Sequence, residues 1–359
     1  MSAPGTQLAF PANIYRGEAA LQKLPTYLAD KPRNILLIGG EQSLPATETT
    51  LRDLLQNHQI TTDFYGGEVT EENAERLKQG AIALKADLII AVGGGKSMDT
   101  AKMAAELAGL PIITIPTIAA TCAALSTVSI RYTDNGHFRD FYHLKSAPEL
   151  VVLDPDIIAK SPIRWLAAGI GDTLAKFYEY RAITQGKPDY SLNIAAFSNG
   201  KVCFEVLTTH GPVAYEKAKD QLVSSELIQT MDAIFIYAAF TSIMGVGAHA
   251  SAAHGLYEGF TVIDKTRHFG HGLLVGYGNI CLLALEHRSD EELCEAIAVA
   301  KACGIPTALT DIAELTPEEL LAVAQASAET EDMHNMPMAI SAQDIIAAMQ
   351  RVDSLSAAV

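Results

Sequence analysis

The sequence predicts an α/β domain built on a parallel sheet, followed by a domain that is entirely helical. Apolar runs alternate with helical patterns through the first third of the chain. Strand-like runs become rare after Asp154, and helix-start signals recur from there to the C-terminus. We therefore expect an α/β domain over residues 1–160 and a helical domain over residues 161–359.

The first third of the chain is predicted to contain four strands with helices between them. The strand at 87–92 (DLIIAV) is apolar almost throughout, which is typical of a central strand buried on both faces. The order strand, helix, strand indicates an open parallel sheet covered by helices. In order, the expected elements are a strand at 34–38, a helix at 45–57, a strand at 60–65, a helix at 71–85, the strand at 87–92, a helix at 96–108 and a strand at 112–115.

Three helix starts are predicted in the second domain. At Ser161-Pro162, serine would be the N-cap and proline the first helical residue. Thr316-Pro317-Glu318-Glu319 has the spacing of a capping box, and Ser341 with Asp344 resembles another start. No internal repeat is apparent.

Composition and charge exclude several classes of protein. The chain has 359 residues, 49% apolar and 19% charged, which argues against a disordered protein. Its net charge of -16 makes nucleic acid and anionic membranes improbable partners. From Asp290 onward, thirteen acidic residues face only Lys301 and Arg351. A site for an anionic cofactor is therefore expected before about residue 290.

The cysteines and the chain start favour a reducing compartment. The five cysteines are scattered without a C-x-x-C pair, so a disulfide framework or structural zinc ribbon is not expected. The N-terminus lacks a signal-peptide pattern, which predicts a cytoplasmic protein. Residues 110–130 carry no charge over 21 residues, but two prolines, four threonines and two serines interrupt them. A buried strand and a pocket-lining loop are predicted there rather than a membrane span.

A glycine-rich turn joins the strand at 87–92 to the next helix. Gly93, Gly94 and Gly95 allow a tight turn and a close approach by a pyrophosphate to the helix N-terminus. The spacing matches neither G-x-G-x-x-G nor a P-loop, and a turn without a ligand is the alternative. Asp99 is also compatible with complementing the helix dipole, and Lys102 with a solvated surface position.

The second domain offers three candidate metal ligands. Asp172, His254 and His271 would give a catalytic metal three N/O ligands and an open position. His249 and His268 are nearby competitors, and a lone histidine on such a helix is more often structural.

The order of these motifs resembles the iron-containing alcohol dehydrogenase superfamily. The motifs are Gly-Gly-Gly-x-x-x-Asp-x-x-Lys, PTIAATCAALS, LAAGIGDTLAKFYE, SAAHG and HFGHG. The nearest resemblance is to the glycerol dehydrogenase-like branch, which includes hydroxycarboxylate dehydrogenase A. It covers most of the chain and implies a Rossmann-like dinucleotide-binding domain, a helical metal-binding domain and an active site in the cleft between them.

The resemblance also assigns roles to individual residues. Asp172, His254 and His271 match the metal ligands and thus the catalytic residues. Iron-type members have a fourth ligand, a histidine, where this chain has Lys176, so zinc is the metal implied. The residues implied for cofactor binding are Gly94, Gly95, Lys96, Asp99, Thr117, Ser126, Val128 and Tyr132.

Two departures from the family bear on substrate and cofactor. Glycerol dehydrogenases carry an aspartate near the polyol where this chain has Cys122, and loss of that carboxylate favours an anionic substrate. Lys176 would contact the carboxylate of such a substrate. The alternative is that Lys176 faces solvent or a neighbouring acid such as Glu179. NAD-using relatives end the first strand with an aspartate where this chain has Gly40, so NAD and NADP both remain open, although Glu41 is adjacent.

These observations predict a metal-dependent, NAD- or NADP-linked oxidoreductase that transfers a hydride between a small alcohol and its carbonyl. A 2-hydroxy or 2-oxo acid is the expected substrate, and glycerol, oxidised to dihydroxyacetone, is the alternative. A lyase similar to dehydroquinate synthase would need more basic side chains near the ligands, and an inactive paralogue would not need intact ligands. The resemblance also implies a homo-oligomer.

Overall fold

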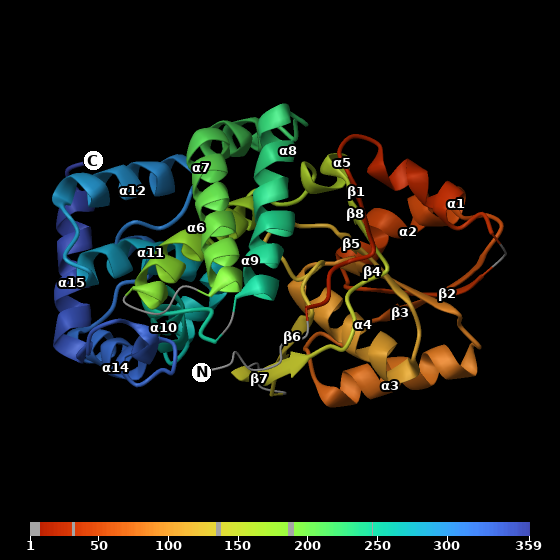
Figure 1. Ribbon diagram of the computed structural model, residues 1–359, viewed down its shortest axis with the longest axis horizontal. Coiled ribbons are helices and arrows are strands. Elements are labelled where there is room, and N and C mark those ends of the chain that lie inside the picture. The colour runs from red at the N-terminus through yellow and green to blue at the C-terminus, as the bar shows by residue number, and fades with distance from the viewer. Residues whose placement is uncertain (1–7, 31–32, 134–137, 186–189, 246) are drawn as a thin grey trace. The chain divides into compact units, whose positions relative to one another are not determined.

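The computed structural model describes residues 8–30, 33–133, 138–185, 190–245 and 247–359. The chain divides into two compact units, unit 1 over residues 1–161 and unit 2 over residues 162–359 (Figure 1). Unit 1 is α/β and unit 2 is helical, as the sequence predicts.

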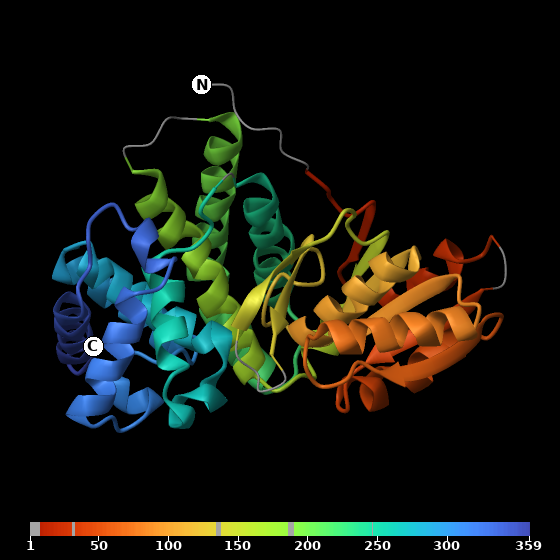
Figure 2. The ribbon, with the colours of Figure 1, turned by 90° about the horizontal axis from the view of Figure 1, so that it is seen from below.

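Unit 1 is built on a parallel sheet of six strands in the order β1-β8-β5-β4-β2-β3. The strands β6 and β7 form a separate antiparallel hairpin (Figure 2). The elements are β1 (Asn13–Arg16), a 3-10 turn (Ala20–Lys23), α1 (Leu24–Tyr27), β2 (Asn34–Gly39), α2 (Ser43–Leu54), β3 (Gln59–Phe64), α3 (Glu71–Ala83), β4 (Leu88–Gly93), α4 (Gly95–Ala108), β5 (Ile112–Pro116), β6 (Val128–Tyr132), β7 (Phe138–His143), β8 (Leu150–Leu153) and α5 (Pro155–Ile158).

The predicted strands and helices of the first third are all present, with ends shifted by no more than three residues. The central strand β4 is buried at every position, as its apolar sequence predicts. The sequence did not reveal β1, β8 or the hairpin. β1 and β8 come from opposite ends of unit 1 and pair with each other, and this pairing has no local signal in the sequence.

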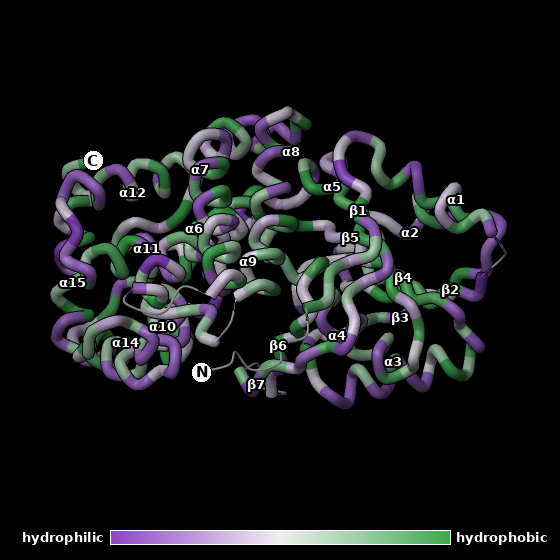
Figure 3. The backbone as a smooth tube through the Cα atoms, in the orientation of Figure 1, coloured by the Kyte–Doolittle hydropathy of each residue, from purple (hydrophilic) through white to green (hydrophobic). Residues whose placement is uncertain are grey.

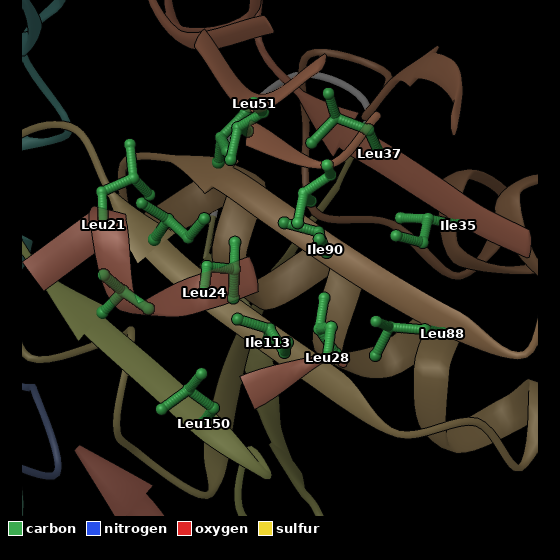
Figure 4. Packing of buried hydrophobic residues seen from close by; sticks show 14 of the residues in the cluster. Leu21, Leu24, Leu28, Ile35, Leu37, Leu51, Leu88, Ile90, Ile113 and Leu150 are labelled. Atoms are coloured by element: carbon green, nitrogen blue, oxygen red, sulfur yellow. The ribbon is translucent and has the colours of Figure 1, made fainter. Parts of the chain in front are cut away.

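One hydrophobic cluster of unit 1 lies along one face of the sheet, and residues on the other face, such as Leu36, Ile38 and Ile89, are buried as well. Leucine and isoleucine side chains from the strands pack against α1 and α2 (Figure 4). The hydropathy along the chain follows this arrangement, because β4 is hydrophobic while α3 alternates between hydrophobic and hydrophilic residues (Figure 3). The cluster includes Leu24, Leu37, Ile90, Ile113 and Leu150. This packing holds the carboxyl ends of the parallel strands at one edge of the sheet.

Among the described residues of unit 2, which leave out 186–189 and 246, no strand occurs. The helices are α6 (Arg164–Thr184), α7 (Ser191–Lys219), α8 (Ser225–Met231), a π-helical segment (Asp232–Tyr237), α9 (Ala238–Met244), α10 (Ala252–Phe260), a 3-10 segment (Asp264–Phe269), α11 (His271–Leu285), α12 (Asp290–Ala302), α13 (Leu309–Ile312), α14 (Pro317–Ala328), a 3-10 turn (Met333–Asn335) and α15 (Ala342–Ser356).

The helix starts at Thr316 and Ser341 are confirmed, and both have reciprocal capping boxes. The start predicted at Ser161 is wrong, because α6 begins at Arg164 with Ile163 as its N-cap. The Ser161 hydroxyl instead donates to the carbonyl oxygen of Ile158, at 2.7 Å, and so serves the end of the preceding helix α5.

The uncharged stretch at 110–130 forms the buried strand β5 and a loop, as predicted, and then the start of β6, which was not predicted. That the loop lines a pocket stays a prediction. Among the described residues, one helical run, Ser225–Met244, is long and apolar enough to cross a bilayer, and 56% of its most apolar window is buried within the protein. This run comprises α8, the π-helical segment and α9, which pack against α7.

Candidate metal centre and cofactor turn

Three ligand-type side chains from three helices of unit 2 meet at one point. Asp172 lies on α6, His254 on α10, and His271 is the first residue of α11. The Nε2 atom of His271 lies 3.1 Å from Oδ1 of Asp172, and Nε2 of His254 lies 3.6 Å from the same oxygen. One ligand atom of each side chain falls within 4.8 Å of the other two. The structure therefore brings together the three residues predicted as ligands.

A fourth residue, Glu179, holds His254 from behind. Its Oε2 lies 2.7 Å from Nδ1 of His254, on the side of the ring away from Asp172. Its Oε1 accepts hydrogen bonds from the backbone N–H groups of Ser251, at 2.8 Å, and of His254, at 3.1 Å. Because Nδ1 is engaged in this way, Nε2 is the nitrogen that His254 presents to Asp172 and His271.

The electrostatics of the cluster are those of a charged group held inside the protein. Burial by itself raises the pKa of Asp172, but hydrogen bonds from both histidines and the charge of Lys176 bring that pKa well below its usual range. Burial also opposes the charging of His254, but Glu179 and Asp172 outweigh it and raise the His254 pKa to about 10. Burial likewise opposes the charge on Glu179, but the charge and hydrogen bond of His254 lower the pKa of Glu179. Without a metal, a proton on His254 supplies the positive charge between two carboxylates.

The donor set fits a divalent metal ion. Two imidazole nitrogens and one carboxylate oxygen are ligands that zinc takes in catalytic sites, with a fourth position left open. Zinc bonds of about 2.0 Å in a tetrahedron separate neighbouring donor atoms by about 3.3 Å. The separations of 3.1 and 3.6 Å between the histidine nitrogens and Asp172 lie on either side of this value. A cation at this point would take the place of the His254 proton.

Close helix packing positions the cluster. A Cβ atom added to Gly272 of α11 would overlap the carbonyl oxygen of Ala168 on α6, and one added to Gly171 would lie 2.5 Å from the carbonyl oxygen of Gly272. Asn279 donates from its side chain to the carbonyl oxygen of Gly171 at 2.8 Å, which ties the same two helices together. Without side chains at these glycines, the two backbones touch, and the adjoining residues Asp172 and His271 are brought within 3.1 Å.

The two competing histidines are engaged elsewhere. Nδ1 of His249 lies 2.9 Å from the hydroxyl of Tyr180, and His268 is exposed, with Nδ1 2.9 Å from the carbonyl oxygen of Lys265. Neither belongs to the cluster of ligand-type residues in the described part of the chain.

The two residues predicted for the substrate occupy different units. Lys176 is half-buried on α6, one turn after Asp172, and its charge lowers the pKa of that aspartate. Glu179 accepts from His254 and from the backbone N–H of Ser251. Cys122 is half-buried in the loop between β5 and β6. Substrate contact by either residue stays a prediction.

In unit 1, the glycine turn lies where β4 ends and α4 begins. Gly93 has a φ of +142°, a conformation that favours glycine, and a Cβ there would lie 2.8 Å from Cβ of Ser97. Gly94 is the N-cap and Gly95 the first residue of α4, so the unbonded N–H groups of the helix start face this turn.

The sheet topology places this turn at a switch point. The strand that follows β2 in the chain, β3, lies on one side of β2 in the sheet. The next strands, β4 and β5, lie on the other side of β2, so the strand order reverses between β2 and β4. The crevice between the carboxyl ends of β2 and β4 is where open α/β sheets bind ligands. Ser43 joins the two loops there, since its Oγ accepts from the N–H of Gly40 and donates to the carbonyl oxygen of Val92.

The other predicted cofactor residues lie around this turn. Lys96 pairs with Glu68 at 2.6 Å and lies 5.1 Å from the ring of Tyr132. The N–H of Thr117, just after β5, donates to the carbonyl oxygen of Gly93 at 2.9 Å. Ser126 precedes β6, and Val128 begins it. Their contact with a cofactor stays a prediction.

Two expectations for the helix α4 change. Asp99 is the fifth residue of α4, not part of its first turn, and Lys102 is not solvated but 2% exposed. The Asp99 carboxylate points inside, 3.0 Å from Nζ of Lys102, while its Oδ2 accepts from the N–H of Ile130. The cofactor contact predicted for Asp99 stays a prediction, and in the structure its carboxylate binds the segment that carries Ile130.

Sequence reasoning missed the roles of Glu179 and Gly272. Glu179 is seven residues after Asp172, two helical turns along the same face, and this spacing was the available signal. Gly272 carried no signal, because its importance depends on the helix that packs against it.

Comparisons with known proteins agree with one another. Residues 11–155 match the family model described as iron-containing alcohol dehydrogenase. The chain is 35% identical to a glycerol dehydrogenase of Pseudomonas putida over 96% of both chains, and 28% identical to hydroxycarboxylate dehydrogenase A of Escherichia coli (strain K12) over 97% of both. The crystal structure of a probable glycerol dehydrogenase from Sinorhizobium meliloti 1021 is 28% identical and superposes over 99% of both chains with a TM-score of 0.86.

Proposed function

The chain belongs to the iron-containing alcohol dehydrogenase family, in its glycerol dehydrogenase-like branch, and from this premise we propose a metal-dependent, nicotinamide-linked dehydrogenase of a small alcohol. The observation that carries the proposal is the cluster of Asp172, His254 and His271, with Glu179 behind it. Three ligands from three helices with an open fourth position are typical of a catalytic rather than a structural metal.

The mechanism assigns each residue a distinct task. A bound divalent metal would polarise the carbonyl oxygen or stabilise an alkoxide, and the nicotinamide would donate or accept the hydride. Asp172 supplies a negative charge that favours the cation, and His254 and His271 supply neutral nitrogen donors. Glu179 keeps the proton of His254 on Nδ1, so that Nε2 stays available. The glycine turn at 93–95 offers backbone N–H groups to a pyrophosphate.

We propose NAD rather than NADP as the cofactor. The ring of Tyr65 lies 3.3 Å from where a Cβ of Gly40 would be, and burial together with the charges of Glu68 and Glu41 raises the Tyr65 pKa. Glu68 already pairs with Lys96 at 2.6 Å, so Glu41, close to the end of β2, is the carboxylate that would repel a 2′-phosphate.

Zinc is the metal proposed. Iron-type members of the family have a fourth protein ligand, a histidine, one turn after the aspartate. In this chain that position on α6 holds Lys176, and its ammonium has no lone pair to donate to a metal. The three remaining ligands are those of zinc sites with an open position.

For the substrate we propose a small 2-hydroxy or 2-oxo acid. Lys176 places a cation one turn from the metal ligand Asp172, and Cys122 removes the carboxylate that a glycerol dehydrogenase would have there. The name hydroxycarboxylate dehydrogenase A, borne by a relative of similar length, supports this class.

Glycerol is the second candidate. Two relatives, at 35% and 32% identity, are named glycerol dehydrogenases. These names favour a neutral polyol, whereas Lys176 and Cys122 favour an anion, and substrate turnover decides between them.

The test is an assay of the zinc-loaded protein with NADH and NADPH against dihydroxyacetone, 2-oxobutanoate and 2-oxoglutarate, and with NAD and NADP against glycerol. Turnover of any of them, lost on metal removal, supports the reaction class. Absence of both bound metal and nicotinamide turnover would contradict it and favour an inactive paralogue. Turnover of glycerol and dihydroxyacetone alone would refute the proposal of a 2-hydroxy or 2-oxo acid as substrate and would support glycerol.

Lys176→Met separates the two substrate classes. Loss of an ionic hydrogen bond should raise the KM for a 2-oxo acid about tenfold or more and leave that for dihydroxyacetone unchanged. Lys219→Met is the control, because it removes an exposed lysine that pairs with Glu216 on α7. Equal effects of Lys176→Met on both substrates would rule out the proposed contact.

A further inference from the structure

A lysine inside unit 1 has no part in the function described so far. Lys102 lies in the middle of α4, two turns after the glycine turn, and its side chain is 1% exposed. A buried ammonium is costly unless its charge is paired and its hydrogen bonds are made. The buried charge of Lys102 therefore needs neighbouring groups that compensate it.

The ammonium of Lys102 is surrounded by oxygen atoms of one short segment. Nζ donates to the carbonyl oxygens of Ala123 at 2.8 Å, Ser126 at 3.0 Å and Val128 at 2.9 Å. The hydroxyl of Ser126 lies 3.1 Å away, and Oδ1 of Asp99 lies 3.0 Å away. An ammonium has only three protons, so these oxygens share them and all depend on the same group.

Asp99 extends the attachment along the chain. Its Oδ2 accepts from the N–H of Ile130 at 3.0 Å, and its own carbonyl oxygen accepts from the hydroxyl of Ser129 at 3.1 Å. On the opposite side, Thr114 of β5 donates to the carbonyl oxygen of Ala124 at 2.7 Å. The segment 123–130 is thus bound to α4 by a side-chain pair and not by strand or helix pairing alone.

The position of this segment gives the pair its significance. The loop between β5 and β6 carries Cys122 and Ser126, and Val128 follows, all of them predicted to meet substrate or cofactor. The same helix α4 begins at the glycine turn proposed for the pyrophosphate. Helix α4 therefore connects the two parts of the proposed cofactor site within unit 1.

We propose that Lys102 is a positioning residue whose buried ammonium fixes the segment 123–128 in the conformation that binds the nicotinamide cofactor. The inference rests on the proposed function, since it concerns the same cofactor. Three carbonyl oxygens directed at one point would repel one another without a cation between them. A neutral, unbranched side chain such as methionine fills most of the space but leaves these oxygens and Asp99 unpaired, so the segment turns away.

The test compares Lys102→Met with the wild type by titration of NADH fluorescence, by zinc titration and by steady-state kinetics. The dissociation constant for NADH should rise at least about tenfold, with the KM for cofactor affected more than kcat. Zinc affinity should stay unchanged, since the metal ligands belong to unit 2. Lys301→Met is the matched control, because it also removes a lysine that donates to a backbone carbonyl, that of Ser356 in unit 2.

A second variant keeps the proposal testable if Lys102→Met does not fold. Asp99→Asn combined with Lys102→Met leaves no unpaired carboxylate, while the side-chain amide oxygen introduced at position 99 can still accept from the N–H of Ile130. This double variant should fold and bind NADH weakly. In Lys102→Ala, propylammonium, which matches the removed atoms, should restore NADH binding, whereas tetramethylammonium, which has no N–H to donate, should not.

Folded variants that bind NADH as well as the wild type would overturn the proposal. Parallel losses of zinc and NADH affinity would also overturn it, because they indicate general damage to the fold. If the wild type binds NADH and the variants do too, only the inference fails; if the wild type binds no nicotinamide cofactor, the proposed function fails with it.

Discussion

At the scale of single residues, the candidate metal centre includes a carboxylate that is not itself a candidate ligand. Glu179 is buried and bonds His254 through both the ring Nδ1 and the backbone N–H. Carboxylates in this position orient a histidine ligand and raise its basicity, and their loss weakens metal binding about 10–100-fold. Glu179 therefore belongs to the candidate site together with the three candidate ligands.

We expect Glu179→Gln to weaken zinc binding by about tenfold or more, because an amide orients the ring less strongly and carries no charge. Competition between the protein and a chromophoric chelator measures the change. Glu286→Gln is the control, since Glu286 is also a buried carboxylate of unit 2 but pairs with Arg181 at 2.5 Å. Equal zinc affinities in the two variants would argue against the orienting role.

Glu258, one turn after His254 on α10, makes stability depend on pH. Burial and the charge of Asp332 raise its pKa to about 7, although His254 opposes this. An acid whose pKa is raised on folding is neutral in both states below the pKa of the unfolded state, and there it does not affect stability. Above that pH the unfolded state loses the proton first, so the folded state becomes less stable until the pH passes the pKa of the folded state. The destabilisation is thus absent below about pH 4.5 and complete above about pH 7.

Glu258→Gln should therefore stabilise the metal-free protein by about 1 kcal/mol near pH 8.5, a value reduced for the partial exposure of the side chain, and by nothing near pH 4.5. Urea unfolding of both proteins at the two pH values gives the difference. A gain of equal size at both would show that charge is not its cause.

At the scale of elements, the contact between α6 and α11 determines whether the ligands meet. Both helices carry glycine where they cross, and the backbone of each fills the space that a side chain of the other would need. Packing this close fixes the separation of the helices and thus the distance from Asp172 to His271. Neither helix alone could set that distance.

Gly272→Ala should destabilise the protein by about 1–3 kcal/mol and weaken zinc binding, because the added methyl overlaps the carbonyl oxygen of Ala168 and the helices must separate. Denaturant unfolding and zinc titration measure the two effects. Gly80→Ala on α3 is the control: its Cβ would lie 3.6 Å from Asp63, an ordinary contact, so this change should be neutral or stabilising by up to about 1 kcal/mol. A Gly272→Ala protein with normal zinc affinity would contradict the role of the contact.

At the scale of the whole molecule, the two proposed ligands bind different units. The candidate metal ligands all belong to unit 2, and the glycine turn with its supporting lysine belongs to unit 1. Each unit also has its own buried core. Each ligand should therefore stabilise mainly the unit that holds it.

Hydrogen exchange of the full chain measures this division. Zinc at about 100 times its dissociation constant adds up to about 2.7 kcal/mol to the stability of the state that binds it, and this should appear as slower exchange in α6, α10 and α11. NADH without metal should instead slow exchange at β4, α4 and the segment 123–128. Zinc protection of β4 equal to that of α11 would contradict the assignment of the metal to unit 2 alone.

The sequence by itself determined the class of fold and most of its elements. Alternating apolar runs predicted β2 to β5 and the helices between them, because the periods of strands and helices are local properties. Capping residues predicted α14 and α15 for the same reason. The order of motifs indicated the family, and with it the three candidate ligands.

The tertiary structure alone decided which of these residues act together. Asp172 and His271 are 99 residues apart, and only the packing of α6 on α11 brings them to 3.1 Å. Lys102 is compatible with a solvated position in the sequence, but the segment 123–130 folds over it. Burial, close helix contact and the partners of a charge depend on what packs against a residue, and no local pattern records that.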